Sequence, residues 1–112
     1  MVEIKKVVLP LQNPLRIPLS GFDVSEVEID INKGERIRFE YTTIPSEAKI
    51  AFNLHSHEGV RPEDVIYHLR RNRSAYSGTF KSKKSDRFYL MWENRDSEKK
   101  AEVTLSKLES KI

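Results

Sequence analysis

Two histidines separated by a single residue are the most chemically informative feature of the sequence. His55 and His57 lie in a stretch that alternates like a strand, so their side chains should point to the same side of a sheet. A sheet can present two imidazoles to one metal ion in this way. His68 could supply a third ligand, and Glu58 or Glu63 a fourth. The pattern therefore raises the hypothesis of a divalent-metal site.

The alternative interpretation of the same pair is an ordinary solvated face. Lys49 and Asn53 alternate in phase with His55 and His57, and both are polar residues typical of exposed positions. We favour this interpretation and predict no resident cofactor, with a divalent metal as the alternative.

A basic segment forms the second candidate site. Residues 70–84 contain six cations and no acid, with Tyr76 and Phe80 between the cations. Phosphates attract cations, and exposed aromatic rings stack on single-stranded bases. The alternative is two charged turns flanking a strand whose aromatic side chains face the core, which we favour because 17 acids nearly balance 20 Lys and Arg in the chain. The candidate contacts are Arg70, Arg71, Arg73, Tyr76, Lys81, Lys83 and Lys84.

Signals for catalysis are lacking. The chain has no cysteine, which excludes thiolate nucleophiles and thiolate zinc sites, and its four glycines form no phosphate-binding loop. Ser74, Ser77 and Ser85 have no glycine-flanked elbow around them. Trp92 lies in a strand-like apolar run that is typical of a core. We predict that the protein is not an enzyme.

Length and composition indicate one folded domain. The 112 residues, 38% of them hydrophobic and 33% charged, suit a single domain over 1–112. The net charge of +3 is too small for a dedicated nucleic-acid binder. Apolar runs such as Val7 to Leu9 fall far short of the roughly 20 residues that span a membrane. We expect a soluble, cytoplasmic protein without a membrane span.

Most of the chain shows the two-residue period of strands. Apolar and charged residues alternate over 27–31 and again over 37–41, with a turn at 32–35, which predicts a hairpin. Residues 48–56 and 101–105 predict further amphipathic strands. Residues 87–93 are apolar on both faces, which predicts a central strand covered on both sides. Prolines interrupt residues 1–20, where we expect edge strands and irregular structure.

The segment from Pro62 to Asn72 carries signals of two kinds. Its initial proline, its early acids and the closing Arg70 and Arg71 are helix signals. Val65, Tyr67 and Leu69 alternate with their neighbours as in a strand. We predict a strand, with a short helix near Pro62 to Arg71 as the alternative. The fold class expected from all these elements is all-β, an antiparallel β-sandwich of jelly-roll type with about 7 to 9 short strands.

The block from Lys49 through Leu105 resembles the GOLD (Golgi-dynamics) domain family, and more closely its free-standing archaeal and bacterial relatives. The cues follow one another along the chain as Asn32 to Phe39, Ile50 to Gly59, Val65 to His68, Ser77 to Phe80 and Phe88 to Asn94. Secretory members carry a cysteine pair, a coiled coil and a membrane span that are not found here. The resemblance therefore implies a β-sandwich and a general binding character.

The function expected from the sequence is that of a non-enzymatic interaction module. Its partner would be a protein that docks on a sheet face or an exposed edge strand. One alternative is a metal-binding protein that uses His55, His57 and His68. The other is weak binding of RNA or single-stranded nucleic acid through residues 70–84.

Overall fold

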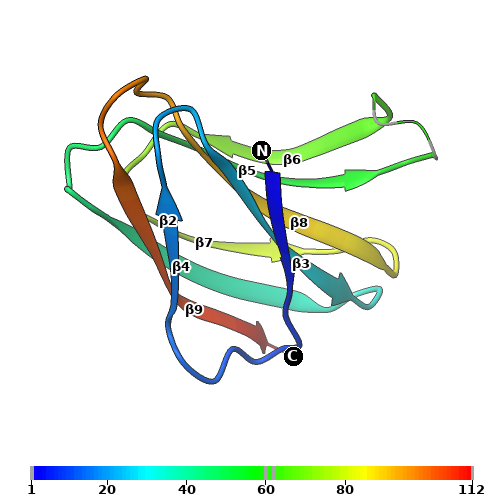
Figure 1. The fold of residues 1–112 in the computed structure, drawn as a ribbon. Helices are drawn as coiled ribbons and strands as arrows, with labels where there is room; N and C mark the ends of the chain where they lie inside the picture. The colour runs from blue at the N-terminus through cyan, green and yellow to red at the C-terminus, as the bar shows by residue number, and fades with distance from the viewer. Residues whose placement is uncertain (1, 60, 62, 112) are drawn as a thin grey trace.

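Two β-sheets packed face to face make up the molecule (Figure 1). The computed structural model describes residues 2–59, 61 and 63–111. Within them, sheet A has the strand order β1-β3-β8-β5-β6 and sheet B the order β2-β9-β4-β7. The strands are β1 (Val2–Lys6), β2 (Leu15–Leu19), β3 (Val24–Ile31), β4 (Arg36–Ile44), β5 (Ile50–His57), β6 (Val65–Arg71), β7 (Tyr76–Lys81), β8 (Asp86–Asn94) and β9 (Ala101–Lys111). The predicted all-β sandwich is confirmed.

Antiparallel pairing dominates both sheets. The exception in the described chain is β1, which runs parallel to β3 at one edge of sheet A. β2 lies at the edge of sheet B, and residues 7–14 join the two edge strands without regular structure. The segment between Val65 and Arg71 is a strand, and no helix occurs in the residues that the structure describes. Pro62, where the alternative helix would begin, lies outside those residues.

The predicted hairpin of residues 27–31 with 37–41 is wrong. β3 pairs with β1 and β8 in sheet A, whereas β4 pairs with β7 and β9 in sheet B. The turn around Gly34, which has a positive φ of 82°, carries the chain from one sheet to the other. Each strand has the expected alternation, but the two apolar faces meet across the core instead of lying side by side in one sheet.

The core lies between the inward faces of the two sheets. Val27, Ile29 and Ile31 of β3 are buried, as their alternation predicts. Aromatic rings fill the centre, with the Trp92 ring centroid 5.7 Å from Tyr41 and 5.5 Å from Phe52. Burial of this apolar surface is the main contribution to the stability of a domain of this size.

The expectation that residues 87–93 are covered on both faces is only half right. β8 does lie in the middle of sheet A, and Phe88, Leu90 and Trp92 are buried against sheet B. Tyr89 and Met91 point to the outer face of sheet A, where they are half-buried and none of the described strands forms a second layer over them. Their apolar character therefore belongs to a surface and not to a second core.

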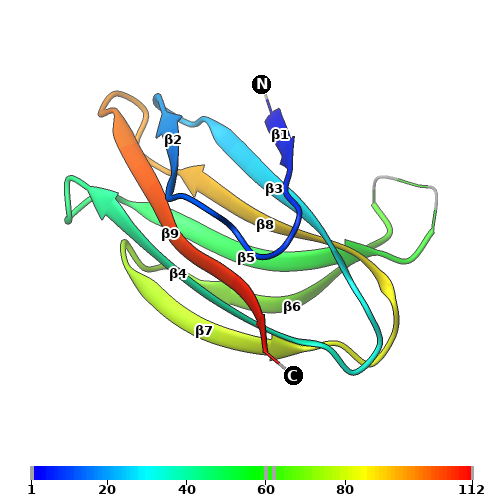
Figure 2. The same ribbon diagram turned by 90° about the horizontal axis from the view of Figure 1, so that it is seen from below.

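Loops at one end of the sandwich are tied together closely. The β2–β3 and β8–β9 connections lie side by side in both views (Figures 1 and 2). A side chain at Gly21 would collide with the backbone carbonyl of Ser97, so this approach requires glycine. The buried Asn94 side-chain amide donates hydrogen bonds to the carbonyl oxygens of Leu19, Ser20 and Lys99. Nowhere in the described chain is there a helix that could span a membrane.

Candidate functional site

The outer face of sheet A carries a cluster of aromatic and imidazole side chains. Strand register places His55 of β5 opposite Tyr89 of β8 on one side and opposite Tyr67 of β6 on the other. His57 follows on the same face of β5, with its ring centroid 5.3 Å from that of His55. The prediction that His55 and His57 share a face is therefore correct.

His55 is not solvated, although the favoured sequence interpretation expects it to be. Only 3% of the residue is exposed, because its ring stacks on Tyr89 at a centroid distance of 5.2 Å and its neighbours close over it. Its Nδ1 shares a hydrogen bond of 2.6 Å with Oδ1 of Asn53. Burial, followed by the charges of His57 and His68, lowers the pKa of His55 to about 4. The imidazole is therefore neutral and fixed in place at neutral pH.

Glu26 of β3 completes this cluster from across β8. Its Oε1 lies 3.7 Å from Nε2 of His55, too far for a direct hydrogen bond. Burial raises the pKa of the Glu26 carboxyl, and the nearby His57 partly opposes this shift. Sheet A thus holds an amide, an imidazole and a carboxyl in a row on a face that sheet B does not cover.

His68 does not join this cluster. Tyr67 pairs with His55 on the outer face, so the next residue of β6, His68, points inward between the sheets. There it lies 5.1 Å from Phe80 and 5.3 Å from Phe88, measured between ring centroids. The structure therefore separates His68 from the other two predicted ligands. No group of three or more His, Asp or Glu side chains suited to a metal ion occurs in the described part of the chain.

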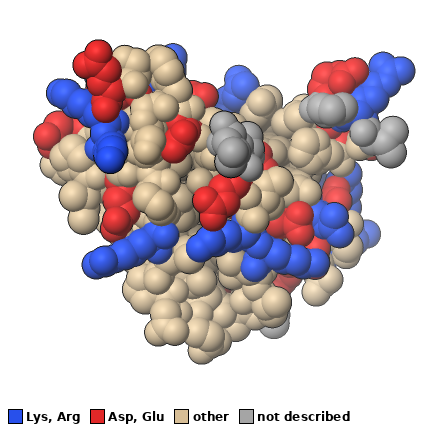
Figure 3. Space-filling view, viewed as in Figure 1, with Lys and Arg blue, Asp and Glu red and all other residues tan. Residues whose placement is uncertain are grey.

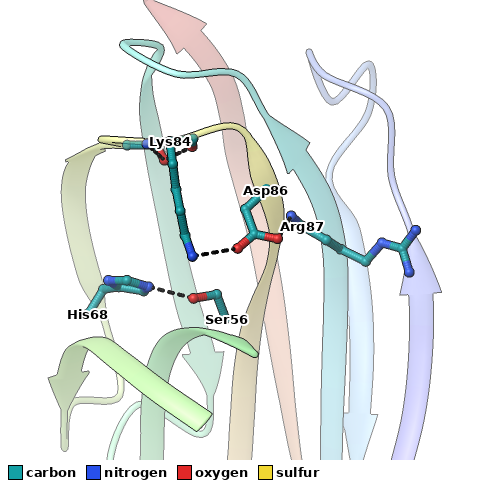
Figure 4. Close-up of polar contacts among 6 residues, drawn as sticks. Ser56, His68, Lys84, Asp86 and Arg87 are labelled. Carbon is teal, nitrogen blue, oxygen red and sulfur yellow. Dashed lines mark hydrogen bonds and ion pairs between the residues drawn. The ribbon is translucent and has the colours of Figure 1, made fainter. Parts of the chain in front are cut away.

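A buried serine is the actual partner of His68. Nε2 of His68 and Oγ of Ser56 share a hydrogen bond of 2.9 Å (Figure 4). Burial, followed by the charge of Lys84, lowers the pKa of His68. Serine and histidine in this contact could suggest a nucleophile, but Ser56 is 0% exposed and no substrate can reach it. The pair was not predicted from the sequence, although Ser56 alternates in phase with the apolar residues of its strand.

Ion pairs lie at the end of the sandwich that is near the β7–β8 turn. Nζ of Lys84 lies 3.3 Å from Asp86, and the Arg87 side chain points away from His68 toward the outer face (Figure 4). Nε of Arg87 is within 3.8 Å of Glu28 and 3.9 Å of Asp30. Opposite charges are therefore locally matched at this end.

The predicted basic segment is divided by the fold. Arg70, Arg71 and Arg73 lie at the β6–β7 connection, whereas Lys81, Lys83 and Lys84 lie at the other end of β7. Between them, the half-buried Tyr76 ring packs on three core rings at centroid distances of 5.9 to 6.4 Å, namely those of Phe39, Phe52 and Tyr41. Tyr76 is thus not an open platform for a nucleic-acid base. Acidic and basic side chains also mix over the face shown in Figure 3.

Tyr67 is an exposed aromatic residue on the outer face of sheet A that its alternation alone did not mark as part of a site. It is 45% exposed, and the guanidinium carbon of Arg70 lies 3.9 Å from its ring centroid. Next to this pair are two adjoining open hollows of about 390 and 460 Å³, which share Asn72 and Arg95 in their linings. We call them together the basic groove, after its cations Lys49, Arg70, Arg71 and Arg95.

Comparison with known proteins gives a fold and no family. No protein-family model matches the chain, and no curated protein is significantly similar to it. The pre-peptidase C-terminal domain of a collagenase from Bacillus anthracis superposes with a TM-score of 0.71 at 14% identity, over 99% of this chain and 97% of that one.

Two further solved structures have the same overall shape. One is PliG of Aeromonas hydrophila, a periplasmic inhibitor of g-type lysozyme, with a TM-score of 0.59 at 14% identity over 96% of this chain and 99% of its own. The other is CorA of Methylomicrobium album BG8, a surface-associated copper-binding protein, with a TM-score of 0.59 at 7% identity over 96% of this chain and 100% of its own. Identities this low show a small β-sandwich alone. The finer assignment to the GOLD family is not confirmed by them.

Proposed function

We propose that this chain is a non-enzymatic module that binds a protein partner through the outer face of sheet A. The observation that carries the proposal is the partly buried cluster of His55, His57, Tyr67 and Tyr89 on a sheet face that no layer of the described residues covers. Rings fixed against one another lose little conformational freedom on binding, and aromatic residues are enriched among the strongest contacts of protein interfaces.

The chemistry of the cluster supports binding more than catalysis. The His55 ring is enclosed and neutral, and its Nδ1 is already hydrogen-bonded to Asn53. In the part of the chain that the structure describes, the serine–histidine contact joins His68 to Ser56, whose side chain is 0% exposed. A general base needs access to a substrate proton, and the enclosed His55 ring does not have it.

Two likenesses agree with this proposal. The fold is shared with an inhibitor of g-type lysozyme, whose action is directed at another protein. The GOLD-like cues in the sequence also imply a binding character, and a GOLD-like origin is part of the proposal. One of those cues, Asn94 at the end of the aromatic strand, has a structural role here because it ties two loops together.

Site-specific photocrosslinking in cells of the source organism tests the proposal. Two variants of the chain are compared. In the first, a photoreactive residue replaces Tyr67 on sheet A; in the control, it replaces Thr42, an exposed residue of sheet B. We expect one defined protein to crosslink to the variant with the probe at position 67 and not to the variant with the probe at position 42. An excess of wild-type chain should compete with this crosslink, whereas an excess of the Tyr67→Ala variant should not. Identical crosslinked products from both positions would contradict the proposal.

Metal binding through His55 and His57 is a second candidate. Their rings lie 5.3 Å apart between centroids on the same face, and a copper-binding protein has a similar fold. His68 takes no part in this version of the hypothesis, because it points between the sheets.

A further inference from the structure

The charges along the basic groove are not balanced in the way they are elsewhere on sheet A. The two hollows are lined by Lys49, Arg70, Arg71 and Arg95, with Glu93 as the one acid among their lining residues. Within the residues that the structure describes, none of the four cations has a carboxylate oxygen within 4.0 Å. An anion could therefore enter the groove without displacing an existing ion pair.

Long-range strand pairing gathers these cations. The backbone N–H of Arg95 donates a hydrogen bond of 2.8 Å to the carbonyl of Lys49, which brings the end of β8 against the start of β5. On the other side of β5, Arg70 and Arg71 pair with Asn53 and Phe52 in the β6 ladder. The groove thus rests on three strands of one sheet, and the sheet fixes the spacing of its cations.

Aromatic rings hold two of the guanidinium groups. Arg70 lies over Tyr67 at 3.9 Å, and Arg71 lies over Tyr76 at 5.3 Å from its ring centroid. The Arg71 side chain also donates a hydrogen bond of 2.7 Å to the carbonyl of Arg70. Stacking restricts the rotation of the side chains while leaving the edges of the planar groups able to bind carboxylates in bidentate fashion.

The groove borders a free strand edge. β6 pairs with β5 alone among the described strands, so its other edge has backbone groups available to an additional strand. An extended polypeptide could pair with this edge while its acidic side chains reach Arg70 and Arg71. Neither a small anion nor a folded basic protein would use both features.

We infer that the basic groove binds an extended acidic segment of the protein partner, along the edge of β6. This inference rests on the proposed function, because it assigns the partner's chemistry at the same face of sheet A. It extends that function by naming the residues that recognise the segment, which are Lys49, Arg70, Arg71 and Arg95.

Fluorescence anisotropy with labelled decaglutamate tests the inference on the whole chain. At about 25 mM NaCl, the double variant Arg70→Gln, Arg95→Gln should bind about tenfold more weakly than wild type, as expected for the loss of two exposed charge contacts. The matched control is Arg36→Gln, Arg38→Gln on β4 of sheet B, which removes the same charge far from the groove. Circular dichroism verifies that both variants are folded.

The binding results distinguish an acidic segment in the basic groove from other ligands. Loss of decaglutamate binding in the groove variant and its retention in the control supports the inference. Equal weakening in both variants, or no binding to wild type, overturns it. Groove-dependent binding of a labelled oligothymidine in place of decaglutamate also overturns it and assigns the groove to nucleic acid. If decaglutamate fails while position 67 still crosslinks to one protein, the acidic segment is refuted and the protein-binding function stands.

Discussion

Acidification should destabilise this protein through His55. Its pKa lies near 4 in the folded protein, against an ordinary value of 6.5, because the ring is buried between Tyr89 and its other neighbours. Between these two pH values the unfolded chain takes up a proton at His55 that the folded protein does not. The free energy of unfolding therefore decreases as the pH falls below 6.5, and this loss is complete once the pH is below 4.

The size of the effect follows from the shift in pKa. A full shift from 6.5 to about 4 corresponds to an upper limit of about 3 kcal/mol, and about 2 kcal/mol of it should be lost by about pH 4.5, which is still above the pKa of the folded protein. Glu26 acts in the opposite direction, because its pKa is raised and the folded protein binds its proton first as the pH falls. The His55→Gln variant keeps the half-buried Glu26 and His68, so the difference between variant and wild type isolates His55.

Urea unfolding at about pH 7.5 and about pH 4.5 measures the effect. On going from about pH 7.5 to about pH 4.5, the free energy of unfolding of the wild type should decrease by about 2 kcal/mol more than that of His55→Gln. An NMR titration of the His55 ring gives its pKa directly. Equal losses in the two proteins, or a His55 ring that titrates near 6.5, would refute the reasoning.

Three further predictions concern single side chains. Asn94→Ala should lower the free energy of unfolding by about 2 to 4 kcal/mol, because three carbonyl groups lose their donor, whereas the exposed Asn13→Ala should change it little in urea unfolding; a loss as small as that of the control would contradict this role. Phe22→Gly should raise the same free energy by up to about 1 kcal/mol, because Phe22 has a φ of 59° and its ring is 65% exposed; a decrease would count against backbone strain. If copper(II) binds, calorimetry should show that His57→Ala loses the affinity and that His68→Ala keeps it, because His68 points away from the pair; the reverse pattern would refute the two-histidine site.

Local alternation made the strands predictable. Residues such as Val27, Ile29 and Ile31 specify an apolar face, and each is buried where the pattern places it. Alternation does not specify which strand lies next to which, so the hairpin of residues 27–31 with 37–41 was an error. Two strands joined by a short turn can pair or can face each other across a core, and both arrangements bury the same side chains.

The candidate site divides in the same way. The spacing of His55 and His57 is enough to put them on one face, because a two-residue period leaves no alternative within a regular strand. His68 lies on the inner side because it alternates with Tyr67, which pairs with His55 on the outer face. The bulge in the β5–β6 pairing then brings Arg70 to the outer face beside Tyr67. A shift of one residue reverses the face of a side chain, and the sequence carries no clear signal for it.

What the sequence by itself determined is therefore the set of strands, the sandwich class and the shared direction of His55 and His57, all of which depend on neighbours along the chain. Tertiary structure alone decided that His55 is buried, that His68 contacts Ser56, and that Lys49 meets Arg95 at the basic groove. These features depend on pairing between distant strands. Such pairing is a property of the whole sheet, since the burial and charge of each side chain are set by residues that the sequence places far away.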